Sequence, residues 1–84
     1  MRYLHEYIGE TIKRERLNQN LGVREFSELA NISSSYLSEV ERGKKNPSGQ
    51  LLDSMSSGLG MNIKELLLRT LTTMEVQEKH RIFR

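Results

Sequence analysis

Apolar and polar residues alternate in the pattern of a one-sided α-helix along the first part of the chain. A first helix is predicted over about residues 6–18, where apolar side chains follow helical spacing: Ile8, Ile12 and Leu17. The run Asn-Gln-Asn-Leu-Gly at 18–22 contains residues that favour turns, so it ends this helix. No segment of the chain shows the strict alternation of a β-strand.

A second and a third short helix follow closely. The second is predicted over about 23–30 and places three apolar residues on one face: Phe26, Leu29 and Ala30. Asn31 suits a left-handed turn after it. Ser33 suits the N-cap of the third helix, because its hydroxyl can accept a hydrogen bond from an unpaired backbone N–H. Leu37 and Val40 give this third helix an apolar face.

Glycine and proline mark the limits of the fourth helix. Gly43 ends the third helix, and Pro47 prevents its continuation. Ser48 is the predicted N-cap of a fourth helix with four apolar residues: Leu51, Leu52, Met55 and Leu59. Gly60 is the predicted end of that helix. The pattern therefore places a short connection between two capped helices.

A fifth helix begins with a sequence typical of a capping box. Asn62 is followed three residues later by Glu65, and five large apolar residues lie within the helix: Ile63, Leu66, Leu67, Leu68 and Leu71. The helical pattern is predicted to end near Met74, before a charged tail at 75–84. We therefore expect an all-α, five-helix domain over 1–74, with no internal repeat or linker.

Composition limits the possible classes of protein. The chain has 84 residues, a net charge of +2 and no cysteine, so it forms one small domain without disulfides or thiolate metal sites. No apolar run approaches the roughly 20 residues of a membrane span, and the N-terminus lacks the apolar segment of a signal peptide. These features predict a cytoplasmic protein that does not bind membranes.

The second and third helices, with a connection of about three residues, have the arrangement of a helix-turn-helix. The third helix starts with hydroxyl side chains, and three cations follow it within 42–45. Helix-turn-helix proteins place the N-terminus of the second helix of this motif in the major groove of DNA. The pattern therefore indicates a DNA-binding protein.

Several motifs also resemble a known family. They are Ile8-Gly9-x-x-Ile12-Lys13-x-x-Arg16, then "ISSSYLSEVERGKKNPS" at 32–48, and Leu59-Gly60. Together they resemble the Cro/repressor-type (XRE-like) DNA-binding domain, a lambda-repressor-like five-helix bundle, over about residues 7–68, and "ERGxxxPS" is a specific signal for it. Within that superfamily, "VREFSELANISSSYLSEVERGKK" and "LHEYIGE" most resemble actinobacterial regulators of Clp-protease genes.

The chain departs from the family pattern at the start of the second helix. Most members have Ser or Thr followed by Gln, whose amide meets a phosphate, whereas this chain has Gly22 and Val23. Asn31 stands where many members have glycine. Backbone N–H groups at this helix start can still face a phosphate. The resemblance therefore assigns phosphate binding to cations: Arg24, Arg42, Lys44 and Lys45.

The resemblance also assigns base contacts to the third helix, at Ser34, Ser35, Ser38 and Glu39. Serine donates or accepts and so discriminates weakly, whereas a glutamate accepts from the amino group of cytosine. Tyr36 is a further candidate, through a thymine methyl or a phosphate. The alternative for Glu39 is a solvated surface charge, and the cations at 42–45 have the same alternative.

Glu41 belongs to a different face of the third helix. The resemblance places it against Arg16 of the first helix, as a partly buried structural ion pair. Neither residue is therefore expected to contact DNA.

The fifth helix has more large apolar residues than a small core needs. Ile63, Leu66 and Leu67 suffice to close the core, and the surplus predicts a dimer interface at Leu67, Leu68, Leu71 and Met74. Extra core packing is the alternative.

Other chemistry has little support in the sequence. His5 and His80 have no nearby set of metal ligands, and the serines lack a neighbouring base and acid for nucleophilic catalysis. We therefore expect no metal, no cofactor, no small-molecule ligand and no enzymatic activity.

The favoured function is a homodimeric transcription regulator that binds double-stranded DNA at a palindromic operator. The family resemblance adds activation or repression of Clp-protease genes as a narrower hypothesis. A restriction–modification controller, an antitoxin or a phage-type repressor are alternatives with the same mechanism. A helix-turn-helix module that mainly binds another protein is the alternative from a different class.

Overall fold

The computed structural model of the protein describes residues 2–82, with side chains described as far as Lys79. It contains five helices and no strand within that range, which confirms the predicted all-α fold class. The helices are α1 (Leu4–Asn18), α2 (Val23–Ala30), α3 (Ser34–Glu41), α4 (Gly49–Gly58) and α5 (Ile63–Ile82).

Three predicted caps explain where α3, α4 and α5 begin. The Ser33 hydroxyl accepts from the Tyr36 N–H at 3.0 Å, at the start of α3. The Ser48 hydroxyl accepts from the Leu51 N–H at 3.3 Å, at the start of α4. At the start of α5, Asn62 Oδ1 accepts from the backbone N–H three residues on at 2.9 Å. Each cap satisfies a donor that has no partner within its own helix.

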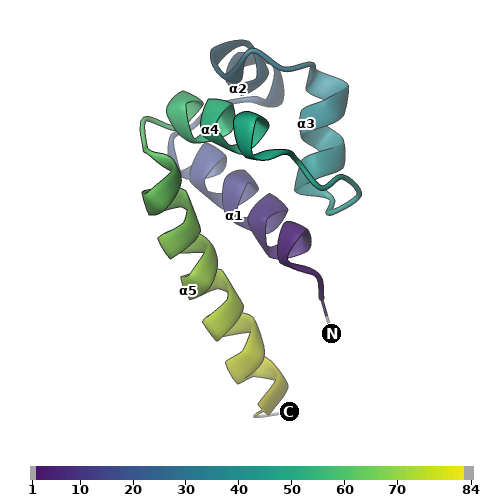
Figure 1. Ribbon diagram of the computed structural model, residues 1–84, viewed down its shortest axis with the longest axis vertical. Coiled ribbons are helices and arrows are strands. Elements are labelled where there is room, and N and C mark those ends of the chain that lie inside the picture. The colour runs from purple at the N-terminus through teal and green to yellow at the C-terminus, as the bar shows by residue number, and fades with distance from the viewer. Residues whose placement is uncertain (1, 83–84) are drawn as a thin grey trace.

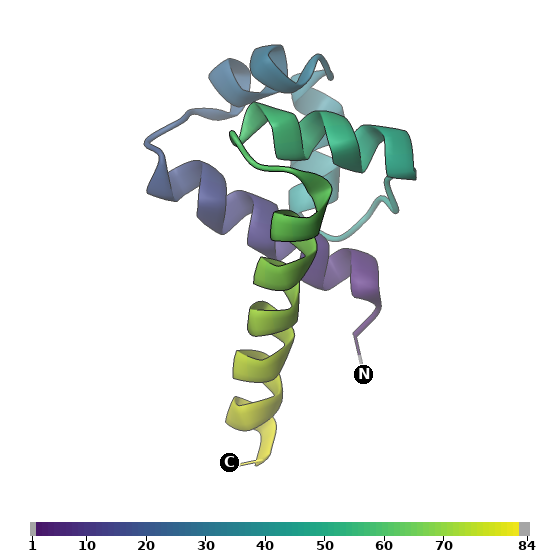
Figure 2. The ribbon, with the colours of Figure 1, turned by 60° about the vertical axis from the view of Figure 1, so that its left-hand side comes forward.

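The core lies where α1 to α4 and the first turn of α5 meet. Its buried apolar residues are Ile8, Ile12, Phe26, Ala30, Leu37, Val40, Met55, Leu59 and Leu66. Figure 1 shows α2, α3 and α4 on one side of α1, while α5 extends past α1 toward the end of the molecule that holds both termini. Figure 2 shows the C-terminal half of α5 projecting away from this helical head.

Two apolar residues assigned to inner faces are exposed instead. Leu17 is 53% exposed, because the α1 position that follows Ile8 and Ile12 at four-residue spacing is Arg16. Leu29 is 60% exposed, because the buried face of α2 centres on Phe26, Ser27 and Ala30. In both helices a leucine next to the buried face points to solvent.

The predicted end of the fifth helix near Met74 is wrong, since α5 continues to Ile82. Residues 75–82 contain no glycine or proline, and Glu, Gln, Lys and Arg are good helix formers. The charged composition therefore reflects exposure and does not end the helix. The last two residues of the predicted tail lie outside the described range.

Candidate nucleic-acid interface

The turn between α2 and α3 fixes the angle between these two helices. Asn31 has φ 57° and ψ 46°, the left-handed conformation expected for it. The next residue, Ile32, donates its N–H to the Ser27 carbonyl at 2.9 Å. The Ser27 and Ser34 hydroxyls lie 3.0 Å apart and join the two helices directly. This arrangement is a helix-turn-helix with α3 as its second helix.

A close backbone approach holds α3 against α1. Leu37 and Val40 are fully buried on the inner face of α3. A Cβ atom at Gly9 of α1 would overlap the Val40 carbonyl, so only glycine allows this approach. The inner face of α3 is therefore held firmly, and its opposite face is left to solvent.

The predicted base-reading residues differ in their position around α3 and in their exposure. Ser34 and Ser35 are exposed, whereas Tyr36, Ser38 and Glu39 are half-buried. The Ser34 hydroxyl already bonds Ser27, and the Tyr36 side chain packs against the core. Both residues thus have a structural role that the sequence pattern did not indicate. Ser35 and Glu39 have no such partner among the contacts of the described residues.

The cations that follow α3 lie on an exposed turn. Gly43 has φ 75°, and the Lys44 N–H donates to the Glu39 carbonyl at 2.8 Å, which closes the end of the helix. Arg42, Lys44 and Lys45 are exposed, and so is Arg24 in the first turn of α2. None of these four cations forms an ion pair with another described residue. Their charges therefore remain available to an anion.

The start of α2 has a feature that the sequence analysis missed. The Glu25 carboxylate accepts the Gly22 N–H at 3.2 Å. One of the backbone donors expected to face a phosphate therefore already has an acceptor in the free protein. The spacing of Glu25 three residues after the cap position is the sequence signal that could have indicated it.

The outer face of α5 is apolar and exposed. Leu67, Leu68 and Leu71 are 44%, 54% and 50% exposed, and Met74 is half-buried. Leu67 therefore does not close the core, contrary to the expectation. Among the described residues of α5, Leu66 is buried in the core and the partly buried Ile63 packs against it. Val76 is 47% exposed, but it lies two residues after Met74 and five after Leu71, so it faces a different side of α5. We call Leu67, Leu68, Leu71 and Met74 the outer stripe.

Two kinds of feature are absent from the described residues. No group of three or more His, Cys, Asp and Glu side chains is placed to hold a metal ion within that range. The His80 side chain lies beyond the described side chains. Across the described part of the chain, none of the helices combines the length and apolar character needed to cross a membrane.

Known proteins with similar sequences and structures share this architecture. Residues 12–66 match the helix-turn-helix family. The chain is 34% identical over 76 residues to the transcriptional regulator ClgR of Mycobacterium tuberculosis, a match that covers 90% of this chain and 68% of that protein. The crystal structure of the clp gene regulator ClgR from Corynebacterium glutamicum has a TM-score of 0.89 at 31% identity, covering 96% of this chain and 86% of that one.

A more distant structure shares the fold. The restriction-modification controller protein C.Esp1396I, solved as a tetramer with its natural 35-base-pair operator, has a TM-score of 0.73 at 21% identity. The match covers 84% of this chain and 99% of that one.

Proposed function

We propose that this chain, which belongs to the helix-turn-helix family of DNA-binding transcription regulators, acts as a homodimer on a palindromic operator. One observation carries the proposal. The outer face of α3 and the exposed cations of the following turn lie together, on a helix whose inner face is held against α1. A rigid helix with a solvent-exposed N-terminal half suits insertion into the major groove.

Base contacts and phosphate contacts have separate residues in this proposal. Ser35 and Glu39 read base edges, with Ser38 beside them. Arg24, Arg42, Lys44 and Lys45 bind phosphates on either side and supply affinity that does not depend on sequence. Ser34 and Tyr36 mainly stabilise the helix-turn-helix. They contact DNA only through atoms that are not used in their contacts within the protein.

The outer stripe of α5 supplies the dimer interface. Soluble monomers rarely expose a long continuous apolar stripe, and a two-fold partner covers it with an identical stripe. Each large apolar side chain that becomes buried contributes about 1.5–3 kcal/mol, against the entropic cost of association.

Genes for Clp proteases are the proposed targets. The support is the identity with the regulators named ClgR, which extends over 90% of this chain. A regulator of these genes would act in the compartment that holds the chromosome, so we expect a cytoplasmic protein.

Selection of genomic DNA fragments by the purified protein tests the whole proposal. We expect recovered fragments to share a palindrome with half-sites about 34 Å apart, upstream of protease genes. Fragments upstream of restriction–modification genes would instead favour the controller function. Recovery of random fragments would contradict sequence-specific binding and favour a module that binds another protein.

A further inference from the structure

An ordinary surface helix packs its apolar face against the protein and exposes its polar face, whereas α5 does the reverse beyond its first turn. Leu66 is the last α5 residue of the apolar core, and the next positions on the same face are Thr70, Thr73 and Gln77. Thr70 and Thr73 are each 1% exposed. The side that packs within the molecule is therefore polar beyond Leu66, and the apolar outer stripe faces solvent.

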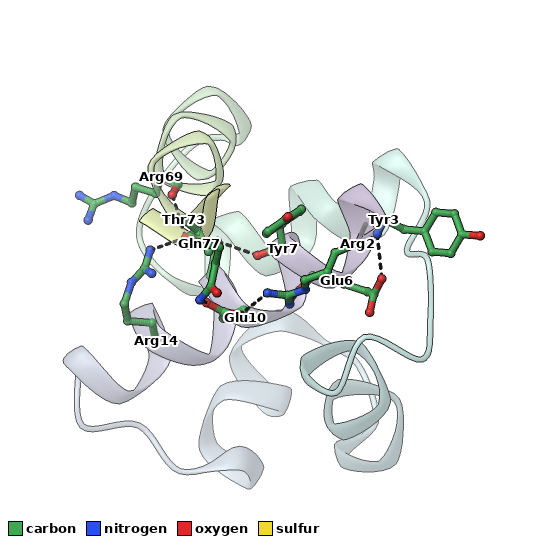
Figure 3. A network of polar contacts seen from close by, with 10 residues as sticks. Arg2, Tyr3, Glu6, Tyr7, Glu10, Arg14, Arg69, Thr73 and Gln77 are labelled. Atoms are coloured by element: carbon green, nitrogen blue, oxygen red, sulfur yellow. Dashed lines mark hydrogen bonds and ion pairs between the residues drawn. The ribbon is translucent and has the colours of Figure 1, made fainter. Parts of the chain in front are cut away.

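Hydroxyl groups form the centre of the contact between α1 and α5. Thr11 is fully buried, and its Oγ1 lies 2.8 Å from Thr73 Oγ1. Arg14 Nη2 donates to the same Thr73 oxygen at 2.8 Å, and Figure 3 shows Thr73 facing Arg14 across the two helices. Thr73 also donates to the Arg69 carbonyl of its own helix at 3.1 Å. One hydroxyl thus joins α5 to two side chains of α1.

Carboxylates complete this contact on either side. The Glu15 side chain is only 8% exposed, and its Oε1 accepts a hydrogen bond from Arg69 Nη1 at 3.1 Å. Toward the other end, Glu10 Oε2 accepts from Gln77 Nε2 at 2.9 Å, and its Oε1 accepts from Arg2 at 2.9 Å (Figure 3). We call this set the polar seam: Arg2, Glu10, Thr11, Arg14, Glu15, Arg69, Thr73 and Gln77.

Hydrogen bonds constrain a helix in a way that apolar packing does not. The free energy of apolar burial has no preferred direction, whereas a hydrogen bond weakens steeply with distance and angle. The seam therefore specifies one rotation and one tilt of α5 on α1. No side-chain polar atom that is buried among the described residues lacks a partner, so the arrangement is fully satisfied.

We propose that the polar seam sets the separation of the two recognition helices in the dimer, with Thr73 as its main positioning residue, so that the seam determines which half-site spacing the protein accepts. This inference rests on the proposed homodimer through α5. If α5 carries the interface, any tilt of α5 on α1 moves α3, which is fixed to α1 through Gly9 and Val40. A tilt of about 10° over a lever of about 20 Å displaces its end by about 3.5 Å, close to the rise of one base pair.

Operators with a variable spacer between two fixed half-sites test this inference. Thr73→Val keeps the shape of the side chain but removes the hydroxyl. Thr70→Val is the matched control, since Thr70 is equally buried on the same helix and its hydroxyl bonds only the Leu66 carbonyl. We expect Thr73→Val to lower the preference for the best spacer over its neighbours by about fivefold or more, because both hydrogen bonds of the Thr73 hydroxyl to α1 are lost, with Thr70→Val within about twofold of wild type.

A second variant and a second measurement guard against a folding defect. Gln77→Ala removes the outer bond to Glu10 at a half-buried position and should shift spacer preference in the same direction. Because the chain has no cysteine, Asn46→Cys allows one spin label per subunit in the exposed connection between α3 and α4. Thr73→Val should broaden the distance distribution between these labels, and Thr70→Val should not.

The outcomes separate this inference from the function on which it rests. A wild-type dimer with a sharp spacer preference, unchanged in both Thr73→Val and Gln77→Ala, would overturn the role of the seam alone. Equal loss in Thr73→Val and Thr70→Val would overturn it too, because general packing would then explain the effect. A monomeric wild-type protein would overturn the proposed dimer and this inference together.

Discussion

Arg16 and Glu41 form a two-point ion pair that joins α1 to the end of α3. Arg16 Nε donates to Glu41 Oε2 at 2.7 Å, and Arg16 Nη2 donates to Oε1 at 3.0 Å. The third edge of the guanidinium reaches the Leu21 carbonyl at 2.7 Å. The two side chains are only 7% and 6% exposed. The pair therefore fixes α3 at its C-terminal end, opposite to the N-terminus that we propose to face DNA.

Loss of Glu41 should destabilise the fold strongly. Glu41→Ala leaves Arg16 buried without its counter-charge, and we expect a loss of about 3–5 kcal/mol in the free energy of unfolding. Chemical denaturation measures this, with the exposed Glu78→Ala as the control. A loss below about 1 kcal/mol, the value of a surface pair, would show that the contact contributes little.

The same pair predicts a pH response. The hydrogen bonds that Arg16 donates to Glu41 raise the pKa of Arg16 above its ordinary value, and the Glu41 charge acts in the same direction, although burial opposes both. A raised pKa stabilises the folded state fully below the ordinary value, and the contribution is lost as pH rises through the folded value. Titration of Arg16 should therefore cause no change in stability from neutral to moderately alkaline pH.

Gly9→Ala should separate α3 from α1. The added methyl group would meet the Val40 backbone, which cannot move without moving the whole helix, so we expect a loss of about 1–3 kcal/mol or more. Gly49→Ala is the matched control, since a Cβ there meets nothing within 4 Å. Thermal unfolding should show that this control is neutral or slightly stabilising, and equal effects of the two changes would contradict the close approach.

Replacing both Lys44 and Lys45 by Ala should weaken specific and non-specific DNA binding alike. Each lost phosphate contact should flatten the dependence of log K on log salt by about 0.9. Binding titrations at several salt concentrations measure the slope. The pair Lys13→Ala and Lys64→Ala removes the same charge from exposed positions on α1 and α5. If both double variants have the same slope, the loss reflects net charge and not contacts.

Glu39→Ala should change sequence preference more than overall affinity. A glutamate that accepts from a base discriminates by about 1–3 kcal/mol at that base pair. Selection from randomised operators compares the variant with Glu28→Ala, an exposed glutamate on α2. If the Glu39→Ala preferences match wild type at every position, Glu39 is a surface charge and other residues read the operator.

Leu71→Glu should give a folded monomer. The change places two carboxylates near the proposed two-fold axis, so binding to an intact palindrome should fall sharply. Leu29→Glu is the matched control. Leu29 is similarly exposed, at 60% against 50% for Leu71, but it lies on α2, outside the proposed interface. Sedimentation of both variants gives the oligomeric state. A dimer of undiminished affinity in Leu71→Glu would place the interface elsewhere, such as the arm around the exposed Tyr3.

The sequence predicted the helices better than it predicted their orientation. Caps at Ser33, Ser48 and Asn62 act through local hydrogen bonds, so their positions follow from nearby residues alone. Leu17 and Leu29 fit helical spacing but are exposed, since which stripe is buried depends on the neighbouring helices. Local patterns therefore define elements, and tertiary packing decides their buried faces.

The polar seam had no sequence signal of its own. Thr70 and Thr73 are polar, and a single sequence gives no reason to place them inside, yet both are buried, and Thr73 meets Thr11 of α1. Likewise, nothing local indicates that the Ser34 hydroxyl meets Ser27 from the preceding helix. Such contacts join residues that are far apart in the chain or on different helices, and they appear only when the helices are placed together.

The opposite faces of α5 separate two kinds of evolutionary constraint. On the inner face, substitutions must preserve hydroxyl, amide and carboxylate partners, because a lost partner leaves a buried polar group unpaired. On the outer stripe, in the proposed dimer, substitutions need only remain complementary to themselves across a two-fold axis. After a gene duplication, changes at Leu68 and Leu71 would thus alter which of the two proteins form dimers with each other. The orientation of α5 on each DNA-binding domain would stay the same.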